Sequence, residues 1–309
     1  MRNERAAGVI YAAAAYTLWG ILPLYWRLVE SVSSTEILAH RILWAFVFVA
    51  VIITATRQWG DVKRIASDRK QLIFVILSSI LISFNWGLYI WAVNSDRIVD
   101  SSLGYYINPL FVVVLGVLIF KEKLSFWQGI ALGAASLGVV IKTIQYGGVP
   151  WISLGLATSF GLYGAMKKFV KTNSMTGLTL ETAVVTPAAA AYIIYRQISG
   201  QGAFATKGTG VILLLLGAGV VTAVPLLLFA KGAKRIPLSL LGFTQYISPT
   251  ISLFLGVFVY RENFTAVDII SFGCIWLALV IYSMSQVGLL KRKTVITGNT
   301  SQNKIEDAV

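Results

Sequence analysis

The chain has one cysteine and one histidine among 309 residues, and only 13% of its residues are charged. A single cysteine, Cys274, excludes a disulfide framework and a thiolate metal site, and the single histidine leaves no set of ligands for a catalytic metal. We therefore expect no metal. Soluble proteins carry about 25% charged residues, whereas this chain is 57% hydrophobic with a mean hydropathy of +0.75. The composition predicts an integral membrane protein with the lipid bilayer as a partner.

The formal net charge is +13, but no basic cluster is interleaved with aromatic residues, so we expect no nucleic-acid partner. The Lys and Arg residues lie between apolar runs long enough to cross a bilayer. Ten such runs are predicted, near residues 7–27, 35–55, 71–93, 102–120, 125–145, 149–167, 178–195, 210–230, 237–260 and 265–286. With the amino end inside, 19 of the 26 Lys and Arg residues fall in inside segments. This asymmetry predicts a multi-pass protein of the cell (inner) membrane with both termini in the cytoplasm.

One stretch of the sequence occurs twice. Residues 106–122 read YINPLFVVVLGVLIFKE and residues 246–262 read YISPTISLFLGVFVYRE, with seven identities in 17 positions that include Tyr, Pro, Gly and Glu. We interpret this as an internal duplication. Because five spans are an odd number, the second copy should cross the membrane in the opposite sense. The predicted fold is all-α, with ten transmembrane helices as two inverted five-helix repeats around a central cavity. The repeats would be residues 1–145 and 146–288, followed by a disordered cytoplasmic tail at 289–309.

The second predicted span carries the strongest local pattern, TEILAHRILW. Glu36, His40 and Trp44 share one helical face, and Arg41 projects about 100° further round. An Arg at the centre of a span costs roughly 2.5–3.5 kcal/mol, so Arg41 should face a wet cavity, pair with an acid or reach an interface. In the functional interpretation, Arg41 lines a transport path and His40 carries a coupling proton. In the alternative, Glu36 and Arg41 merely anchor the helix.

Further polar residues lie at positions where a solute could bind. Asn85 and Tyr89 share a stripe of the third span, and an Asn in hydrocarbon needs a partner helix or water. Pro109 and Pro249 should each bend a helix and free a carbonyl one turn earlier, although such bends also serve packing alone. The other candidates flank those bends or occupy the first span: Trp19, Tyr105, Tyr106, Asn108, Gln245, Tyr246 and Ser248. Gly129 and Gly133 have a spacing suited to close helix contact.

Three segments, LWGILPLYW, TEILAHRILW and SLGYYINPL, resemble the RarD-type branch of the EamA family, within the drug/metabolite transporter superfamily. The resemblance covers the chain except its tail. It implies a basket of ten helices in inverted halves around a cavity, moving small organic solutes, usually outward. Members are named for chloramphenicol sensitivity or are linked to the export of amino acids and metabolites. The positions that match the branch are Trp19, Glu36, His40, Arg41, Trp44, Tyr106, Asn108 and Pro109.

The function predicted from the sequence is that of a secondary transporter. It would export small metabolites or drug-like solutes, such as amino acids or chloramphenicol-like amphiphiles, by alternating access. The chain has no GxxxxGK[ST] motif, so neither nucleotide nor another cofactor is expected. Two alternatives are a membrane-embedded enzyme acting on lipid-type substrates and a membrane scaffold without transport. An enzyme is not expected, because Glu36 and Glu181 stand as isolated acids in the spans.

Overall fold

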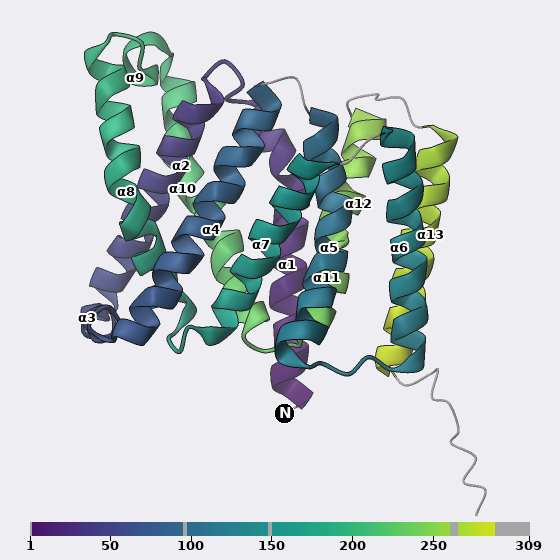
Figure 1. Cartoon of the computed structure of the whole chain (residues 1–309). Coiled ribbons are helices and arrows are strands. Elements are labelled where there is room, and N and C mark those ends of the chain that lie inside the picture. Colours follow the sequence, from purple (N-terminus) through teal and green to yellow (C-terminus); the bar gives the residue numbers. More distant parts are fainter. Residues whose placement is uncertain (1, 95–97, 148–149, 260–264, 288–309) are drawn as a thin grey trace, which may run out of the picture.

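A computed structural model describes residues 2–94, 98–147, 150–259 and 265–287 (Figure 1). The described residues form helices and no strands. The elements are α1 (Arg2–Arg27), α2 (Ser34–Ala55), α3 (Trp59–Ser67), α4 (Arg69–Asn94), α5 (Ile98–Phe120), α6 (Phe126–Tyr146), α7 (Trp151–Phe169), α8 (Ser174–Ile198), α9 (Ala203–Thr206), α10 (Thr209–Ala233), α11 (Leu238–Gln245), α12 (Ile247–Phe254), the π-helix η1 (Leu255–Val259) and α13 (Ala266–Val287). The predicted tail at 289–309 lies outside the described residues. So do Arg261 and Glu262, the last two residues of the second motif copy.

The helix ends follow from local sequence signals. Ser125 and Gln128 form a reciprocal capping box at the start of α6, and α6 ends at Gly147, whose φ of 80° suits a residue without a Cβ. Asn173 begins α8 by accepting a hydrogen bond from the N–H of Thr176 at 2.7 Å. These caps satisfy backbone groups that a helix end leaves unpaired.

Nine helices of the described chain are long and apolar enough to cross a membrane. They agree with nine of the ten predicted spans, and the chain is a multi-pass membrane protein. The remaining predicted span, 149–167, is present as α7 but is less apolar than those nine helices. It contains small polar residues and has Lys167 and Lys168 in its last turn. Helix α7 packs between α4, α5 and α10, so its surface meets protein on several sides. A helix shielded in this way can be less apolar than one surrounded by lipid.

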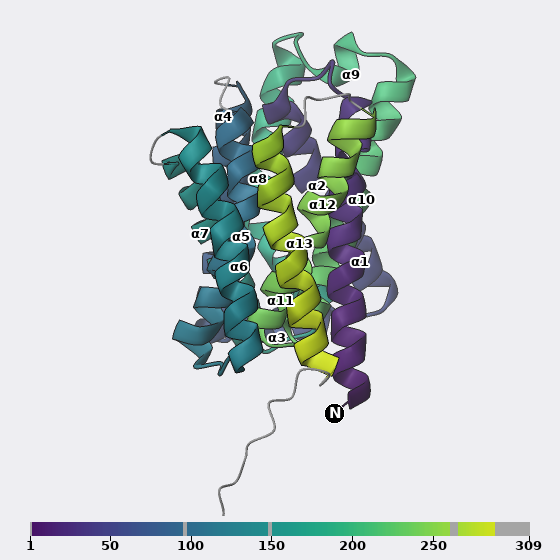
Figure 2. The same cartoon turned by 90° about the vertical axis from the view of Figure 1, so that its right-hand side faces the viewer.

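The helices pack as one bundle, with α6 and α13 paired at its side. Helix α2 packs against α8 and α10, α5 against α7 and α11, and α1 against α10 and α12. Helices α6 and α13 lie side by side at the right-hand edge of Figure 1 and face the viewer in Figure 2. Their close approach is at Gly138, where a Cβ would lie 2.6 Å from the carbonyl oxygen of Ser271. The predicted close contact at Gly129 and Gly133 is wrong, since nothing lies within 4 Å of a Cβ at either position.

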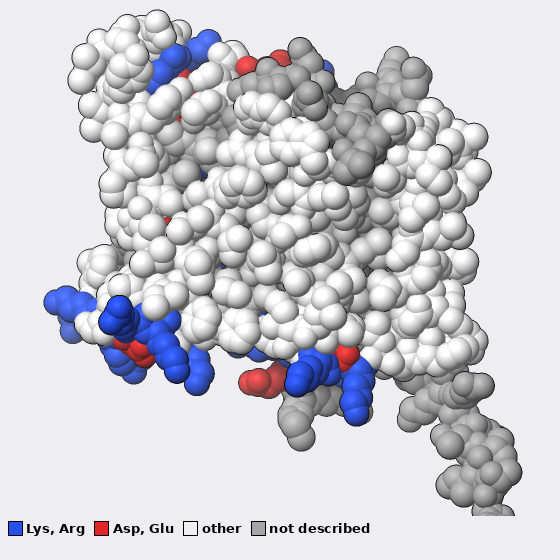
Figure 3. All heavy atoms as spheres, in the orientation of Figure 1, with Lys and Arg blue, Asp and Glu red and all other residues white. Residues whose placement is uncertain are grey.

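Charged residues gather at the two ends of the bundle, with an apolar band between them (Figure 3). Most of the Lys and Arg visible in that view lie at the end where α1 begins and α5, α7 and α10 finish. We call it the basic end. The opposite end carries α9, and we call it the α9 end. The band of uncharged side chains is what a lipid-facing surface requires.

Candidate functional site

Arg41 lies among aromatic rings rather than beside an acid. Its Cζ atom is 4.5 Å from the ring centre of Trp26 on α1 and 5.2 Å from that of Trp86 on α4. Its Nε donates to the hydroxyl of Thr222 on α10 at 3.2 Å. Four helices therefore contribute to its surroundings, with Tyr89 on α4 and Tyr105 on α5 near enough to interact with it electrostatically. We call these five residues, Trp26, Trp86, Tyr89, Tyr105 and Thr222, the Arg41 cage.

The Arg41 cage surrounds a cation that has no direct acidic partner in the described part of the chain. Among the described residues, no carboxylate lies within ion-pair distance of Arg41. A guanidinium over an aromatic face gains roughly 0.5–2 kcal/mol, and its planar fork of N–H donors matches a carboxylate. Tyr105 is 45% exposed, and its ring packs edge-on against Tyr89 with centres 6.2 Å apart. Arg41 and its cage thus combine a cation, four aromatic rings and the Thr222 hydroxyl.

The face of α2 that carries Glu36 and His40 is directed toward α8 and α9. The buried Glu36 carboxylate accepts the backbone N–H of Ala203 at 2.6 Å and pairs with Arg196 at 3.5 Å. The Trp44 indole donates to Nδ1 of His40 at 3.1 Å, and the His40 ring lies against Phe204. Glu36, His40 and Trp44 are therefore brought together, while Arg41 faces the cage. Within the described chain, Nε2 of the fully buried His40 has no hydrogen-bond partner.

Trp19 belongs to an aromatic cluster between α1, α7 and α10. Its ring centre is 5.6 Å from Tyr16, 5.7 Å from Phe160 and 5.6 Å from Phe229. Tyr163 stacks on Phe229 with centres 5.8 Å apart. These rings fill the interior of the bundle, so in this conformation Trp19 packs against protein.

A buried ion pair lies next to this cluster and was not among the candidate residues. The Lys167 ammonium contacts both Glu181 carboxylate oxygens, at 2.6 and 2.5 Å, and both side chains are 3% exposed. The Tyr163 hydroxyl donates to the same carboxylate at 3.3 Å. The predicted span 149–167 ends at Lys167, and a lysine in the last turn of a span with an acid two turns into the next helix could have indicated the pair.

A small cavity lies between Trp86 of the Arg41 cage and Glu181 of the ion pair. It has a volume of ≈ 10 Å³, and Trp86, Tyr163, Glu181 and Leu226 are among its lining residues. This volume is about the space needed for one water molecule. The predicted central cavity is therefore nearly filled at this position.

The duplicated motif joins α5 to α11. After Phe120 the chain turns at Lys121, which has a φ of 51°, and the Glu122 carboxylate accepts the N–H groups of Leu238 at 2.6 Å and Ser239 at 2.8 Å. A carboxylate at the start of a helix satisfies unpaired donors and complements the helix dipole. A Cβ at Gly116 would lie 2.8 Å from that carboxylate, so the paired Gly and Glu of this copy have a structural reason.

The two prolines of the motif lie in different surroundings. Helix α5 continues through Pro109, whereas α11 ends at Gln245 and α12 begins at Ile247, two residues before Pro249. The Tyr246 hydroxyl donates to the Tyr106 carbonyl at 3.4 Å. The remaining motif candidates are Asn108 and Gln245, which are buried with side-chain oxygens unpaired within the described chain, and Ser248, whose carbonyl lies near Gly20.

Asn85 has found a partner helix. Its amide donates to the carbonyl of Leu156 and the hydroxyl of Ser159, both at 2.9 Å. These bonds connect α4 to α7, which satisfies the polar group in an apolar region. In this conformation Asn85 stabilises packing.

Comparisons with known proteins agree with this architecture. The sequence model described as "EamA-like transporter family" matches residues 6–144 and 147–284. The uncharacterized transporter YojE of Bacillus subtilis is 49% identical over 92% of this chain and 96% of its own length. Protein RarD of Streptomyces exfoliatus is 40% identical over 94% of this chain and 92% of its own length. The chloramphenicol-sensitive protein RarD of Pseudomonas aeruginosa is 27% identical over 93% of this chain and 96% of its own length. A crystal structure of another protein superposes with a TM-score of 0.65 at 17% identity, covering 91% of this chain and 98% of that one, which shows a shared fold.

Proposed function

Because the chain belongs to the EamA-like transporter family, we propose that it is a secondary transporter that exports small organic solutes across the inner membrane by alternating access. The observation that carries the proposal is the Arg41 cage, a guanidinium between two indole rings without a carboxylate partner among the described residues. A charged side chain within a membrane span is energetically costly, so its presence there indicates a functional site. The cage suits a solute that carries a carboxylate and a flat or apolar group, as an aromatic amino acid does.

The positions of the charged residues support the rest of the proposal. The basic end faces the cytoplasm by the positive-inside rule, and α1 begins there. Ten crossings would comprise the nine apolar helices and α7, as two repeats of opposite orientation. The two buried acids support the inversion, since Glu36 lies near the start of α2 at the α9 end and Glu181 lies on α8 close to the basic end.

The driving force is proposed to be a proton gradient sensed at His40. Its Nδ1 accepts a hydrogen bond from Trp44, so the neutral ring carries its proton on the buried Nε2. Uptake of a second proton would break the bond from Trp44, because Nδ1 would become a donor. A His40→Gln protein with the flux and pH dependence of the parent chain would refute this role.

The test of the transport proposal is counterflow in proteoliposomes. The solutes are radiolabelled aromatic amino acids, small amino acids and chloramphenicol, each with and without a pH gradient. We expect saturable exchange of a carboxylate-bearing aromatic solute, lost in Arg41→Gln and reduced in Arg41→Lys, which keeps the charge but not the planar fork. Arg64→Gln is the matched control, since the Arg64 side chain is 70% exposed on α3. Equal exchange by Arg41→Gln and Arg64→Gln would refute the Arg41 cage as the binding site.

A further inference from the structure

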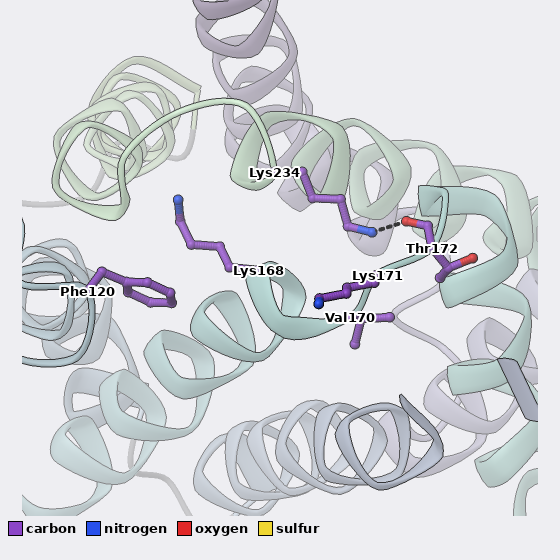
Figure 4. A pocket seen from close by; sticks show the side chains of 6 residues that line it. All are labelled: Phe120, Lys168, Val170, Lys171, Thr172 and Lys234. Carbon is purple, nitrogen blue, oxygen red and sulfur yellow. Dashed lines mark hydrogen bonds between the residues drawn. The ribbon is translucent and has the colours of Figure 1, made fainter. Parts of the chain in front are cut away.

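An open hollow of ≈ 550 Å³ lies at the basic end. Figure 4 shows Phe120 and Lys168 toward one side of the hollow, Lys234 and Thr172 toward the other, and Lys171 between them. The lining residues come from the end of α5, from the end of α7 and the link that follows it, and from the end of α10: Phe120, Lys168, Val170, Lys171, Thr172 and Lys234. Three lysine side chains thus line one hollow, with the ammonium groups of Lys168 and Lys234 directed toward opposite sides of it (Figure 4).

The carboxylates nearest this hollow are already engaged. Glu181 is held by Lys167, and Glu122 by the N–H groups of Leu238 and Ser239. Among the described residues, neither Lys168, Lys171 nor Lys234 forms an ion pair. Glu122 and Glu181 act on Lys168 and Lys234 only from a distance, so the three lysines line the hollow without a direct carboxylate partner among the described residues.

Lys168 and Lys234 each use one N–H donor to bind a backbone carbonyl. Lys168 donates to the carbonyl of Ile236 at 2.6 Å, and Lys234 donates to the carbonyl of Thr172. Lysines at helix ends stabilise the carbonyl-rich termini in this way. An ammonium has three N–H donors, so two remain on each, and no partner is found for the exposed Lys171 ammonium within the described residues.

Two further observations concern groups that line the hollow. The Thr172 hydroxyl is buried without a hydrogen-bond partner in the described chain, and Thr172 lines the hollow. Burial, and after it the positive charge of Lys167, lower the pKa of Lys234 to about 8. A bound anion would oppose both effects by favouring the charged ammonium.

We propose that this hollow is a binding site for a phosphate-bearing anion. A phosphate group offers several oxygens to donors that arrive from different directions, as Lys168, Lys171 and Lys234 do. The volume exceeds that of the bare ion, so an attached organic group would lie against the Phe120 ring. The source is either a soluble phosphate compound or the head group of an anionic phospholipid, which basic pockets on the cytoplasmic side of membrane proteins bind. The site is independent of the transport proposal, because none of its residues belongs to the Arg41 cage.

The test is lysine acetylation followed by mass spectrometry, with the full chain in phosphatidylcholine nanodiscs at pH 8. Inorganic phosphate is the soluble probe, with chloride at equal ionic strength as its control. If binding raises the pKa of Lys234 by one unit from about 8, the free-amine fraction at pH 8 falls about fivefold, and labelling slows by the same factor. Exposed Lys63 on α3 is the internal control, and its labelling rate should not change.

The outcomes separate the two sources. Protection of Lys234 by inorganic phosphate supports a soluble ligand, and protection only in nanodiscs that contain phosphatidylglycerol supports a lipid head group. No protection in either arm, or equal protection of Lys63, overturns the proposal. A Lys171→Gln/Lys234→Gln protein should lose phosphate protection of Lys168, whereas the matched Lys63→Gln/Lys70→Gln protein should keep it. The measurement on the parent chain decides the question if the first double variant does not fold.

Discussion

The buried pair of Lys167 and Glu181 predicts strongly non-additive mutations. Removing one member of a buried ion pair leaves an uncompensated charge and costs about 3–5 kcal/mol, whereas replacing both by apolar groups is often neutral or stabilising. Both side chains are 3% exposed, and the ammonium contacts both carboxylate oxygens, so we take the middle of that range. Lys167→Met and Glu181→Leu should each lower the free energy of unfolding by about 4 kcal/mol. The double variant should unfold within about 1 kcal/mol of the parent chain.

The assay is unfolding in sodium dodecyl sulfate of the detergent-solubilised protein, followed by loss of helical circular dichroism. The three variants and the parent chain form a double-mutant cycle, which isolates the pairwise energy. The control cycle uses Arg64→Met and Asp61→Leu, because the 2.6 Å pair of Arg64 and Asp61 is exposed and should couple by less than about 1 kcal/mol. A double variant of Lys167 and Glu181 that loses the sum of the two single losses would refute the reasoning.

Three other predictions concern contacts that can be changed singly. Gly219→Ala should destabilise the protein by about 3 kcal/mol in the same assay, because its Cβ would lie 2.2 Å from the α2 backbone. Its control is Gly129→Ala, whose Cβ would have no described atom within 4 Å, and which should stabilise α6 by about 0.5–1 kcal/mol. Glu122→Gln should cost about 2 kcal/mol, measured by thermal unfolding, since it removes the charge from two hydrogen bonds of 2.6 and 2.8 Å. The pKa of Lys234 is lowered from 10.5 to about 8, so the unfolded chain binds more protons between these values, and the Lys234 contribution to stability rises with pH across that window.

A specific result would contradict each of these three predictions. Equal stability changes for Gly219→Ala and Gly129→Ala would contradict the close crossing of α2 and α10. An unchanged melting temperature of Glu122→Gln would mean that the carboxylate charge adds nothing to the cap. A Lys234→Met protein should have a smaller rise in stability between pH 8 and 10.5 than the parent chain, and an identical profile would contradict the assigned shift.

Apolar run length was sufficient to predict most of the bundle. A span must be apolar over about 20 residues, and that requirement is written in the sequence itself. The match of the family model to residues 6–144 and 147–284 agrees with the duplication inferred from the paired Tyr, Pro, Gly and Glu. Breaks within a span are less visible, and the predicted helix at 237–260 is divided into α11, α12 and η1.

The partners of buried polar residues could not be predicted. Arg41 was expected to face water, an acid or an interface, but its neighbours are indole rings from α1 and α4. Those neighbours depend on how distant helices cross, and helical periodicity fixes only the direction in which a side chain points. The same limit applies to the pair of Lys167 and Glu181, because the two residues lie 14 positions apart on successive helices and periodicity within one helix does not relate them.

The weak hydropathy of α7 has a consequence for the order in which the protein is made. A segment with two lysines in its last turn has less tendency to leave the aqueous channel of the insertion machinery than its neighbours. Its packing partners α4 and α5 precede it in the chain and are already in the bilayer when it emerges. We therefore expect the amino-terminal half to act as a template for membrane entry of the second half, so that the second half synthesised by itself would misplace its first helix.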